Sequence, residues 1–253
     1  MDILLAGETF SAINSVATGA SVVTNSTWSN GATAFISALS AAGHTVTQIG
    51  GERCSSEFPM DLDGLQNYAA VVLSDVSALT LLVTPETRAG RVSVNRLELL
   101  KTYVDRGGGL LMAGGYMSFQ GMFGNAHFYN TAIEDILPIR CLPWADGLEV
   151  PEGARPSVCL PTHPIAAELD LSWPPVLGFN KVDFRQDGTC RLIATARCRG
   201  HEWPLLATRE YGKGRSAAWM SDIGPHWISE QFLQSQVYQR LMVNIIHWLS
   251  KSE

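Results

Sequence analysis

The sequence lacks three features that would place the protein in a familiar class. It has no apolar run of the roughly 18 residues that a membrane-spanning helix needs, and no basic segment precedes the apolar residues 3–6, so neither a membrane span nor a signal peptide is expected. Its five cysteines form no CxxC pair, which argues against a disulfide framework or a zinc knuckle. Lys and Arg form no cluster and the net charge is -6, which argues against binding nucleic acid or an anionic membrane. We therefore expect a reduced, cytoplasmic protein.

The chain does have the composition and the periodicity of an α/β protein. With 253 residues, 46% of them hydrophobic, it can bury a sizeable core. Apolar runs predict strands at residues 2–6, 45–49, 69–73 and 110–113, and helical periodicity predicts helices at about 31–42, 61–68, 95–106 and 131–137. Ser29 or Asn30 is the predicted cap of the first helix, and the residues from 9 to about 28, rich in Ser, Thr and Asn, are predicted to form a loop over the sheet edge. Successive strand–helix units predict a doubly wound, mostly parallel sheet in residues 1–138.

Residues 139–218 have a different texture. Prolines cluster there, and short strand candidates at 158–160 and 190–194 replace the helical patterns. Residues 205–211 and 215–220 flank Gly212-Lys213-Gly214, which predicts a hairpin. Because no linker separates this segment, we expect a β-rich extension of the same domain. Residues 219–253 are expected to hold the end of a late strand and one amphipathic helix at 232–249, so that helices cover both faces of the sheet.

A glycine-rich turn at residues 107–121 is the most distinctive local feature. Glycines flank the short apolar run 110–113, and Gly114-Gly115 lets the chain turn sharply as it leaves this buried strand. We call this turn the elbow. In α/β proteins such a turn holds reactive side chains at the carboxyl edge of the sheet. The residues at the tip are Tyr116, Met117 and Ser118.

The elbow and several later blocks resemble one family. Residues 113–121, Ala-Gly-Gly-Tyr-Met-Ser-Phe-Gln-Gly, resemble the GGYxSFxG stretch of a glutamine amidotransferase-like family of unknown function, within the class I glutamine amidotransferase-like superfamily. Similar blocks follow in the expected order at residues 149–153, 177–180, 211–215 and 221–227, the last reading Ser-Asp-Ile-Gly-Pro-His-Trp. The resemblance covers nearly the whole chain, and it implies a flavodoxin-like three-layer α/β sandwich.

The resemblance does not extend to the catalytic triad of the superfamily. Working members carry a Cys on the elbow in a G-x-C-x-G setting and a His-x-Glu pair after a late strand. In this sequence Tyr116 takes the Cys position, and His226 is followed two residues later by Ile228. Glutaminase activity is therefore not expected.

Two other roles of the elbow residues stay open. Ser118 could act as a nucleophile with His226 as its base and Asp222 or Glu230 as the orienting acid, which would make the protein a hydrolase; alternatively, Ser118 caps a helix. Tyr116 is a poor nucleophile, because a phenol of pKa near 10 is only about one part in a thousand ionised at neutral pH. Its hydroxyl could donate to a ligand, or its ring could close the pocket of a scaffold or assembly subunit, including a homo-oligomer.

The leading hypothesis is binding of a small polar molecule at the carboxyl edge of the sheet. The predicted ligand-binding set consists of Glu8, Trp28, Asp75, Tyr116, Met117, Asp222 and His226. The joint acidity of this set suits a hydroxyl-rich or cationic ligand, or a metal. The histidines and cysteines lack metal-ligand spacing, so no dedicated metal site is predicted. No cofactor is predicted either, since the glycines at 107–109 precede a strand instead of opening a helix.

Overall fold

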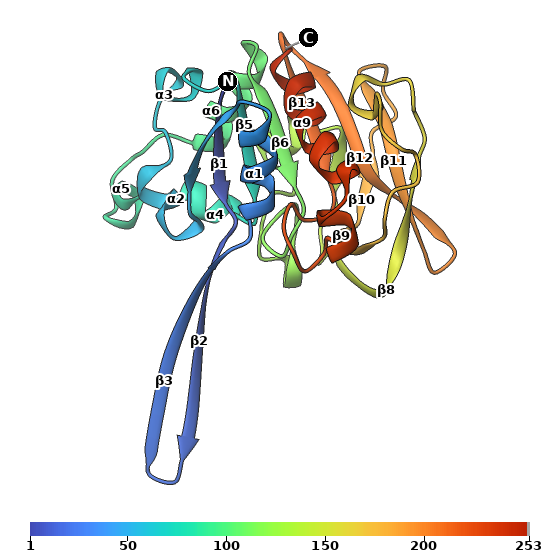
Figure 1. Ribbon diagram of the computed structural model, residues 1–253. Helices are drawn as coiled ribbons and strands as arrows, with labels where there is room; N and C mark the ends of the chain where they lie inside the picture. Colours follow the sequence, from blue (N-terminus) through green and yellow to red (C-terminus); the bar gives the residue numbers. More distant parts are fainter. Residues whose placement is uncertain (252–253) are drawn as a thin grey trace.

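The computed structural model describes residues 1–251, in which one mixed sheet forms the centre of the molecule (Figure 1). Within these residues the sheet has nine strands in the order β4-β1-β5-β6-β13-β12-β11-β8-β9. The parallel part comprises β4 (Thr45–Ile49), β1 (Asp2–Gly7), β5 (Ala70–Ser74), β6 (Gly109–Ala113) and β13 (Gly214–Trp219). The antiparallel part comprises β12 (His201–Tyr211), β11 (Cys190–Cys198), β8 (Gly147–Val158) and β9 (Val176–Asn180). The predicted α/β fold, with a parallel core and a β-rich extension, is confirmed.

Helices cover both faces of the parallel strands, which explains why the central strands β1, β5 and β6 are nearly continuous apolar runs. Helices α1 (Thr33–Ala41) and α9 (Gln236–Ser250) lie side by side on one face (Figure 1). The other face carries α2 (Gly51–Glu57), α3 (Leu62–Gln66), α4 (Ala78–Leu82) and α6 (Arg96–Asp105), with α5 (Pro85–Arg88) and α7 (Ala132–Ile136) beside them. Short 3-10 turns lie at η1 (Met122–Gly124) and η2 (Pro164–Ala166). Among the described residues, no helix is both long and apolar enough to cross a membrane.

Several predicted element boundaries are confirmed and others are wrong. Helix α6 begins after Asn95, whose side chain accepts two backbone N–H groups as a cap. The first helix instead begins after Ala32, and the Asn30 side chain accepts the N–H of Ala32 and exchanges hydrogen bonds with Gln48, so it does not cap the helix. The predicted terminal helix is two helices, α8 (Glu230–Leu233) and α9, because the Ser235 hydroxyl caps a new helix. The predicted strand at 158–160 is misplaced, since β8 ends at Val158.

Residues 9–30 form a long β-hairpin, so the prediction of a loop there is wrong. Strands β2 (Thr9–Thr18) and β3 (Ser21–Asn30) pair antiparallel over their full length, from Thr9 opposite Asn30 to Thr18 opposite Ser21. The many Thr, Val and Ile residues favour extended backbone, and Gly19, at φ 60°, begins the tight turn. This hairpin, which we call the arm, projects away from the body of the molecule (Figure 1).

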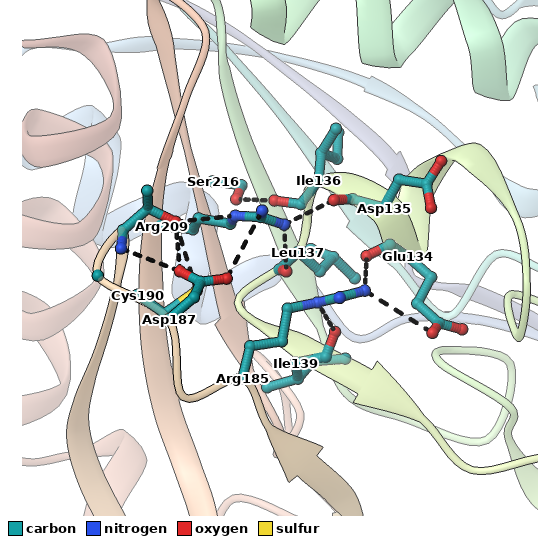
Figure 2. Close-up of polar contacts among 12 residues, drawn as sticks. Glu134, Asp135, Ile136, Leu137, Ile139, Arg185, Asp187, Cys190, Arg209 and Ser216 are labelled. Atoms are coloured by element: carbon teal, nitrogen blue, oxygen red, sulfur yellow. Dashed lines mark hydrogen bonds and ion pairs between the residues drawn. The ribbon is translucent and has the colours of Figure 1, made fainter.

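Side chains from the extension complete the end of α7, which stops before Pro138. The carbonyls in the last turn of a helix have no partner within the helix. Here Arg185 donates to the carbonyl of Glu134 and Arg209 donates to that of Asp135 (Figure 2). Arg185 follows β10 (Val182–Phe184), which pairs with β7 (Ile139–Cys141). The extension is thus fastened to the parallel core by side chains as well as by the β12–β13 pairing.

Candidate functional site

The carboxyl ends of β1, β5, β6 and β13 meet at one edge of the sheet and surround a pocket. Its volume is about 490 Å³. Five residues of the predicted ligand-binding set line it, and they are joined by residues from the base of the arm, including Phe10 and Asn30. The five are Asp75, Tyr116, Met117, Asp222 and His226. The rule that ligands bind beyond the carboxyl ends of parallel strands therefore identifies this part of the surface.

Glu8, Asp75 and Asp222 form an acidic trio beside the pocket. Each follows the carboxyl end of a parallel strand, β1, β5 and β13 respectively. One carboxylate oxygen from each residue lies within 4.8 Å of the other two. Glu8 and Asp75 have φ values of 59° and 47°, a left-handed conformation that turns the chain sharply at the end of its strand. Neighbouring strands of the sheet thus bring together residues that are distant in sequence.

The hydrogen bonds of the acidic trio are incomplete. The Ser74 hydroxyl donates to Glu8 Oε2 at 2.5 Å, and the Met117 N–H donates to Asp75 Oδ1 at 2.6 Å. Backbone N–H groups beside Asp222 favour its ionised form, but its Oδ1 is buried and accepts no hydrogen bond within the described residues. Asp222 is only 4% exposed. A buried carboxylate oxygen without a donor is costly, so this atom needs an explanation.

Burial raises the pKa of all three carboxyl groups. The pKa of Glu8 rises to about 8, because burial and the neighbouring Asp75 outweigh the hydrogen bond from Ser74. The pKa of Asp75 rises to about 6 through burial, although the Met117 N–H opposes the rise. Burial, and then the charges of Glu8 and Asp75, raise the pKa of Asp222 well above its ordinary value. Three close carboxylates in such a place cannot all ionise without a positive partner.

Aromatic and polar side chains form the rim of the pocket around Glu149. Its Oε1 accepts from the Tyr116 hydroxyl at 2.7 Å and from the Trp227 indole at 2.9 Å, and it lies 3.4 Å from His226 Nε2. The rings of Tyr116 and His226 meet edge to face, with centroids 5.2 Å apart. Burial, and then the bond to Glu149, raise the pKa of Tyr116 to about 12. The Tyr116 phenol therefore stays protonated and donates.

The side chain of Ser118 is buried within the elbow and is 1% exposed. Its hydroxyl accepts the backbone N–H of Asp75 at 3.1 Å. Residues 115–121 form turns and no helix, so the expected helix-capping role of Ser118 is wrong. Within the part of the chain that the structure describes, no hydrogen bond joins Ser118 to His226. The arrangement favours a structural role, in which Ser118 holds the backbone at the end of β5.

A second buried group, which we call the elbow hub, consists of Asp146 and Asn180. Asn180 accepts the N–H of Gly115 at 3.0 Å and donates to Asp146 Oδ1 at 2.7 Å. The Asp146 carboxylate also accepts the N–H groups of Gln120 at 2.8 Å and Gly121 at 2.9 Å. Burial raises the pKa of Asp146 to about 6, against the effect of these hydrogen bonds. The hub thus holds the backbone of the elbow at Gly115 and at Gln120 and Gly121.

Sequence reasoning missed the hub, Glu149 and the contribution of the arm. Glu149 and Asn180 come from the extension, and only the family-like blocks at 149–153 and 177–180 could have indicated them. Phe10 and Asn30 were missed because the arm looked like a loop. Trp28 lies on the arm opposite Ser11, is 60% exposed and is not among the residues that line the pocket.

A larger hollow, of about 720 Å³, lies beside α7. Its three acidic residues share it with three basic ones, and two of the acids have basic partners: Asp135 is 2.7 Å from Lys101, and Glu134 is 3.8 Å from Arg185. The charges in this hollow are balanced, whereas those of the acidic trio are not. We therefore regard the pocket at the carboxyl edge as the candidate site.

Comparison with known proteins agrees with this architecture. Residues 2–251 match the family model described as "putative glutamine amidotransferase". The chain belongs to this family. Two cytoplasmic proteins from Salmonella typhimurium, one of them from strain LT2, are each 32% identical to it, with TM-scores of 0.91, over 98% of this chain and 99% of theirs. A ThuA-like protein from Parabacteroides merdae, 17% identical with a TM-score of 0.57 over 100% of this chain and 90% of its own, shows the fold alone. No curated protein matches the sequence significantly.

Proposed function

We propose that this family member binds a small polar molecule in the cytoplasm and does not hydrolyse glutamine. The proposal rests on the position of Tyr116 and on its hydrogen bond. It takes the position at which working members of the superfamily have their cysteine, and its hydroxyl donates to Glu149. The description of the two Salmonella relatives as cytoplasmic supports the location.

The chemistry at the elbow argues against hydrolysis. A phenol with a pKa of about 12 is not a nucleophile at neutral pH. The Ser118 hydroxyl is occupied by a backbone N–H, and the residue two positions after His226 is Ile228 instead of a glutamate. A hydrolase using Ser118 and His226 gains no support from this arrangement.

The pocket itself argues for a ligand. About 490 Å³ is a usual size for a small-molecule site, and Tyr116, 38% exposed, leaves the pocket open. This openness speaks against a scaffold in which Tyr116 closes the pocket. Phenol, imidazole and carboxylate groups lie around the space among apolar side chains such as Phe10, so that a molecule with several hydroxyl groups can be oriented there.

The first test is ammonia release from L-glutamine by the purified protein, with a working class I amidotransferase as the positive control. We expect no release above the rate without protein. A serine-reactive phosphonate should likewise leave Ser118 unlabelled. Glutamine-dependent ammonia release, or labelling of Ser118 that His226→Ala abolishes, would contradict the proposal.

The second test is direct binding. A panel of hydroxylated and carboxylated metabolites is screened by thermal shift against the wild type and Tyr116→Phe. We expect at least one compound that stabilises the wild type and stabilises Tyr116→Phe less, because the variant lacks one donor at the rim. A stabilising compound that protects both proteins equally would place the binding site elsewhere.

A further inference from the structure

No Lys or Arg acts on the charges of Glu8, Asp75 or Asp222 within the described residues, and the single positive group that does so is His226, which acts on Asp75 alone. We propose that the trio binds a divalent cation such as Mg²⁺, Ca²⁺ or Mn²⁺ beside the pocket, where Asp75 and Asp222 line its wall. This inference rests on the proposed function, because the cation lies at the wall of the same pocket and supplies a contact for the polar ligand.

The positions of the oxygens suit a single cation. Three atoms no more than 4.8 Å apart all lie within about 2.8 Å of one central point (4.8 Å divided by √3). Oxygen ligands bind Ca²⁺ at about 2.3–2.6 Å and Mg²⁺ at about 2.0–2.1 Å, so a small inward movement of the side chains completes the contacts. Gly31 and Gly115 leave room for the trio, since a Cβ on Gly31 would collide with Glu8 and one on Gly115 with Asp75.

The unpaired oxygen of Asp222 is the second, independent observation. Asp222 lines the pocket and is almost fully buried, yet its Oδ1 accepts no hydrogen bond within residues 1–251. Its neighbours in the trio offer further carboxylate oxygens and no N–H donor. A cation satisfies this oxygen and neutralises the surrounding charge, which a neutral ligand cannot do.

The chemistry of the donors selects the kind of ion. All three ligands are carboxylates, and hard cations prefer oxygen ligands, whereas zinc and copper favour His and Cys. A carboxylate site of this kind leaves no characteristic spacing in a sequence, because its members come from three different strands. The coordination positions that face the pocket stay available to hydroxyl or carboxylate oxygens of the bound molecule.

The test uses the full-length protein after treatment with EDTA and removal of the chelator. CaCl₂, MgCl₂ and MnCl₂ are titrated separately to about 10 mM, above the dissociation constants of even weak calcium modules, and followed by thermal shift and calorimetry. We expect at least one cation to raise the Tm with one-to-one stoichiometry. Asp222→Asn should weaken binding at least tenfold, whereas Asp183→Asn, an exposed aspartate outside the trio, should bind as the wild type does.

Glu8→Gln provides a second variant if Asp222→Asn fails to fold, as judged by circular dichroism. The proposal is overturned if no cation raises the Tm, or if both trio variants bind as tightly as the wild type. Because no organic ligand is present, the result is separate from the test of the proposed function. If a metabolite binds equally well with and without EDTA, the proposed ligand-binding function holds and only the cation proposal fails.

The arm carries a second inference from a different observation. Its 22 residues contain no Asp, Glu, Lys or Arg, although the whole chain has a net charge of -6. Several of its large apolar side chains are exposed: Ile13 (73%), Val16 (60%), Val22 (68%), Val23 (63%) and Trp28 (60%). Exposed strand edges are normally protected by charges, and a lone two-stranded hairpin is marginally stable in water. We infer that the arm packs against a second copy of this chain.

Charge and size both favour a second copy. Two uncharged arms can meet without bringing like charges together, although the whole chain carries a net charge of -6. The arm offers 20 residues in its two strands, against about 20–30 residues on each side of a standard interface. Since Phe10 and Asn30 line the pocket, assembly through the arm also fixes one wall of the site.

The test is the molar mass in solution, measured by light scattering over a wide concentration series. We expect an oligomer of the 27.5 kDa chain. A variant in which Asn-Gly replaces residues 11–28, joining the paired Phe10 and Ser29, should be monomeric, as should the full-length double variant Ile13→Lys, Val22→Lys. Met60→Lys, at an exposed apolar residue outside the arm, is the control and should keep the wild-type mass. A monomeric wild type, or a shortened variant with the wild-type mass, overturns the inference; a monomer that captures an unrelated protein does so as well.

Discussion

The elbow hub and the acidic trio both contain buried carboxyl groups, but the hydrogen bonds are complete only in the hub. In the elbow hub, Asp146 accepts from Asn180, Gln120 and Gly121. In the acidic trio, Asp222 Oδ1 accepts from no atom that the structure describes. Asp146 and Asp222 are the same residue type and are both buried, so they differ in two respects: the number of donors around each carboxylate and the presence of other acids beside Asp222.

The comparison separates structural acids from acids that need a ligand. A buried carboxylate with several donors holds chain segments together, and the hub does this for Gly115, Gln120 and Gly121. A buried cluster that keeps an oxygen unpaired gains little for the fold, and such places are typical of binding sites. If this distinction is correct, substitutions in the hub reduce stability, whereas substitutions in the trio affect binding.

The largest effect is expected for Asn180→Ala. The change removes the donor to Asp146 and the acceptor for the Gly115 N–H, so two buried polar groups lose a partner. Each such loss costs about 1–3 kcal/mol, and we expect the free energy of unfolding to fall by about 2–5 kcal/mol. Urea unfolding, with the slope compared between the two proteins, measures this change. A loss below about 1 kcal/mol would show that the hub is not a structural centre.

The pH dependence of the hub should be the next largest effect. Because the pKa of Asp146 is about 6 in the folded protein and 3.8 ordinarily, the folded state holds this proton more tightly. The resulting stabilisation is complete below pH 3.8 and is lost as the pH rises through 6. It amounts to at most ~3 kcal/mol, from about two pKa units.

The measurement is the difference in unfolding free energy between the wild type and Asp146→Asn, since the other acids titrate in both proteins. The advantage of the wild type should shrink as the pH rises from the ordinary pKa of 3.8 to the folded-state value of about 6. An advantage that stays constant or grows over this range would mean that Asp146 is ionised throughout.

The sequence was sufficient to predict the acidic trio, but not the elbow hub. The apolar strands are bounded by glycines and turns, so the parallel core could be predicted, and with it the meeting of Glu8, Asp75 and Asp222 at one edge. The hub and Glu149 were not predictable from periodicity, because Asp146 and Asn180 come from a segment of irregular strands whose pairing no periodicity fixes; only the family-like blocks pointed to part of this region. The arm was missed because its Ser, Thr and Asn residues resemble a loop, although the β-branched residues among them favour strands.

A smaller effect is expected at the rim of the pocket. Tyr116→Phe removes the hydroxyl that donates to Glu149 but leaves the bond from the Trp227 indole. Because this site is partly exposed, water can replace the lost donor, and the cost should be about 0.5–1.5 kcal/mol. Urea unfolding of the two proteins, followed by circular dichroism, measures this change. If the free energy of unfolding falls as much as it does for Asn180→Ala, Tyr116 is a structural residue like those of the hub.

The smallest effect on stability is expected for Asp222→Asn in protein free of divalent cations. The substitution keeps the shape of the side chain and removes one potential negative charge from the buried cluster. Because Oδ1 accepts no hydrogen bond in the described residues, none is lost at that atom. The free energy of unfolding should stay within about 1 kcal/mol of the wild type, and any change should be an increase. Urea unfolding in EDTA provides the measurement, with Asn180→Ala analysed beside it.

If Asp222→Asn destabilises the protein as strongly as Asn180→Ala, the trio contributes to the fold, and the distinction between the hub and the trio fails. If it leaves the fold intact and abolishes cation binding, the incomplete hydrogen bonding of Asp222 is explained by a ligand.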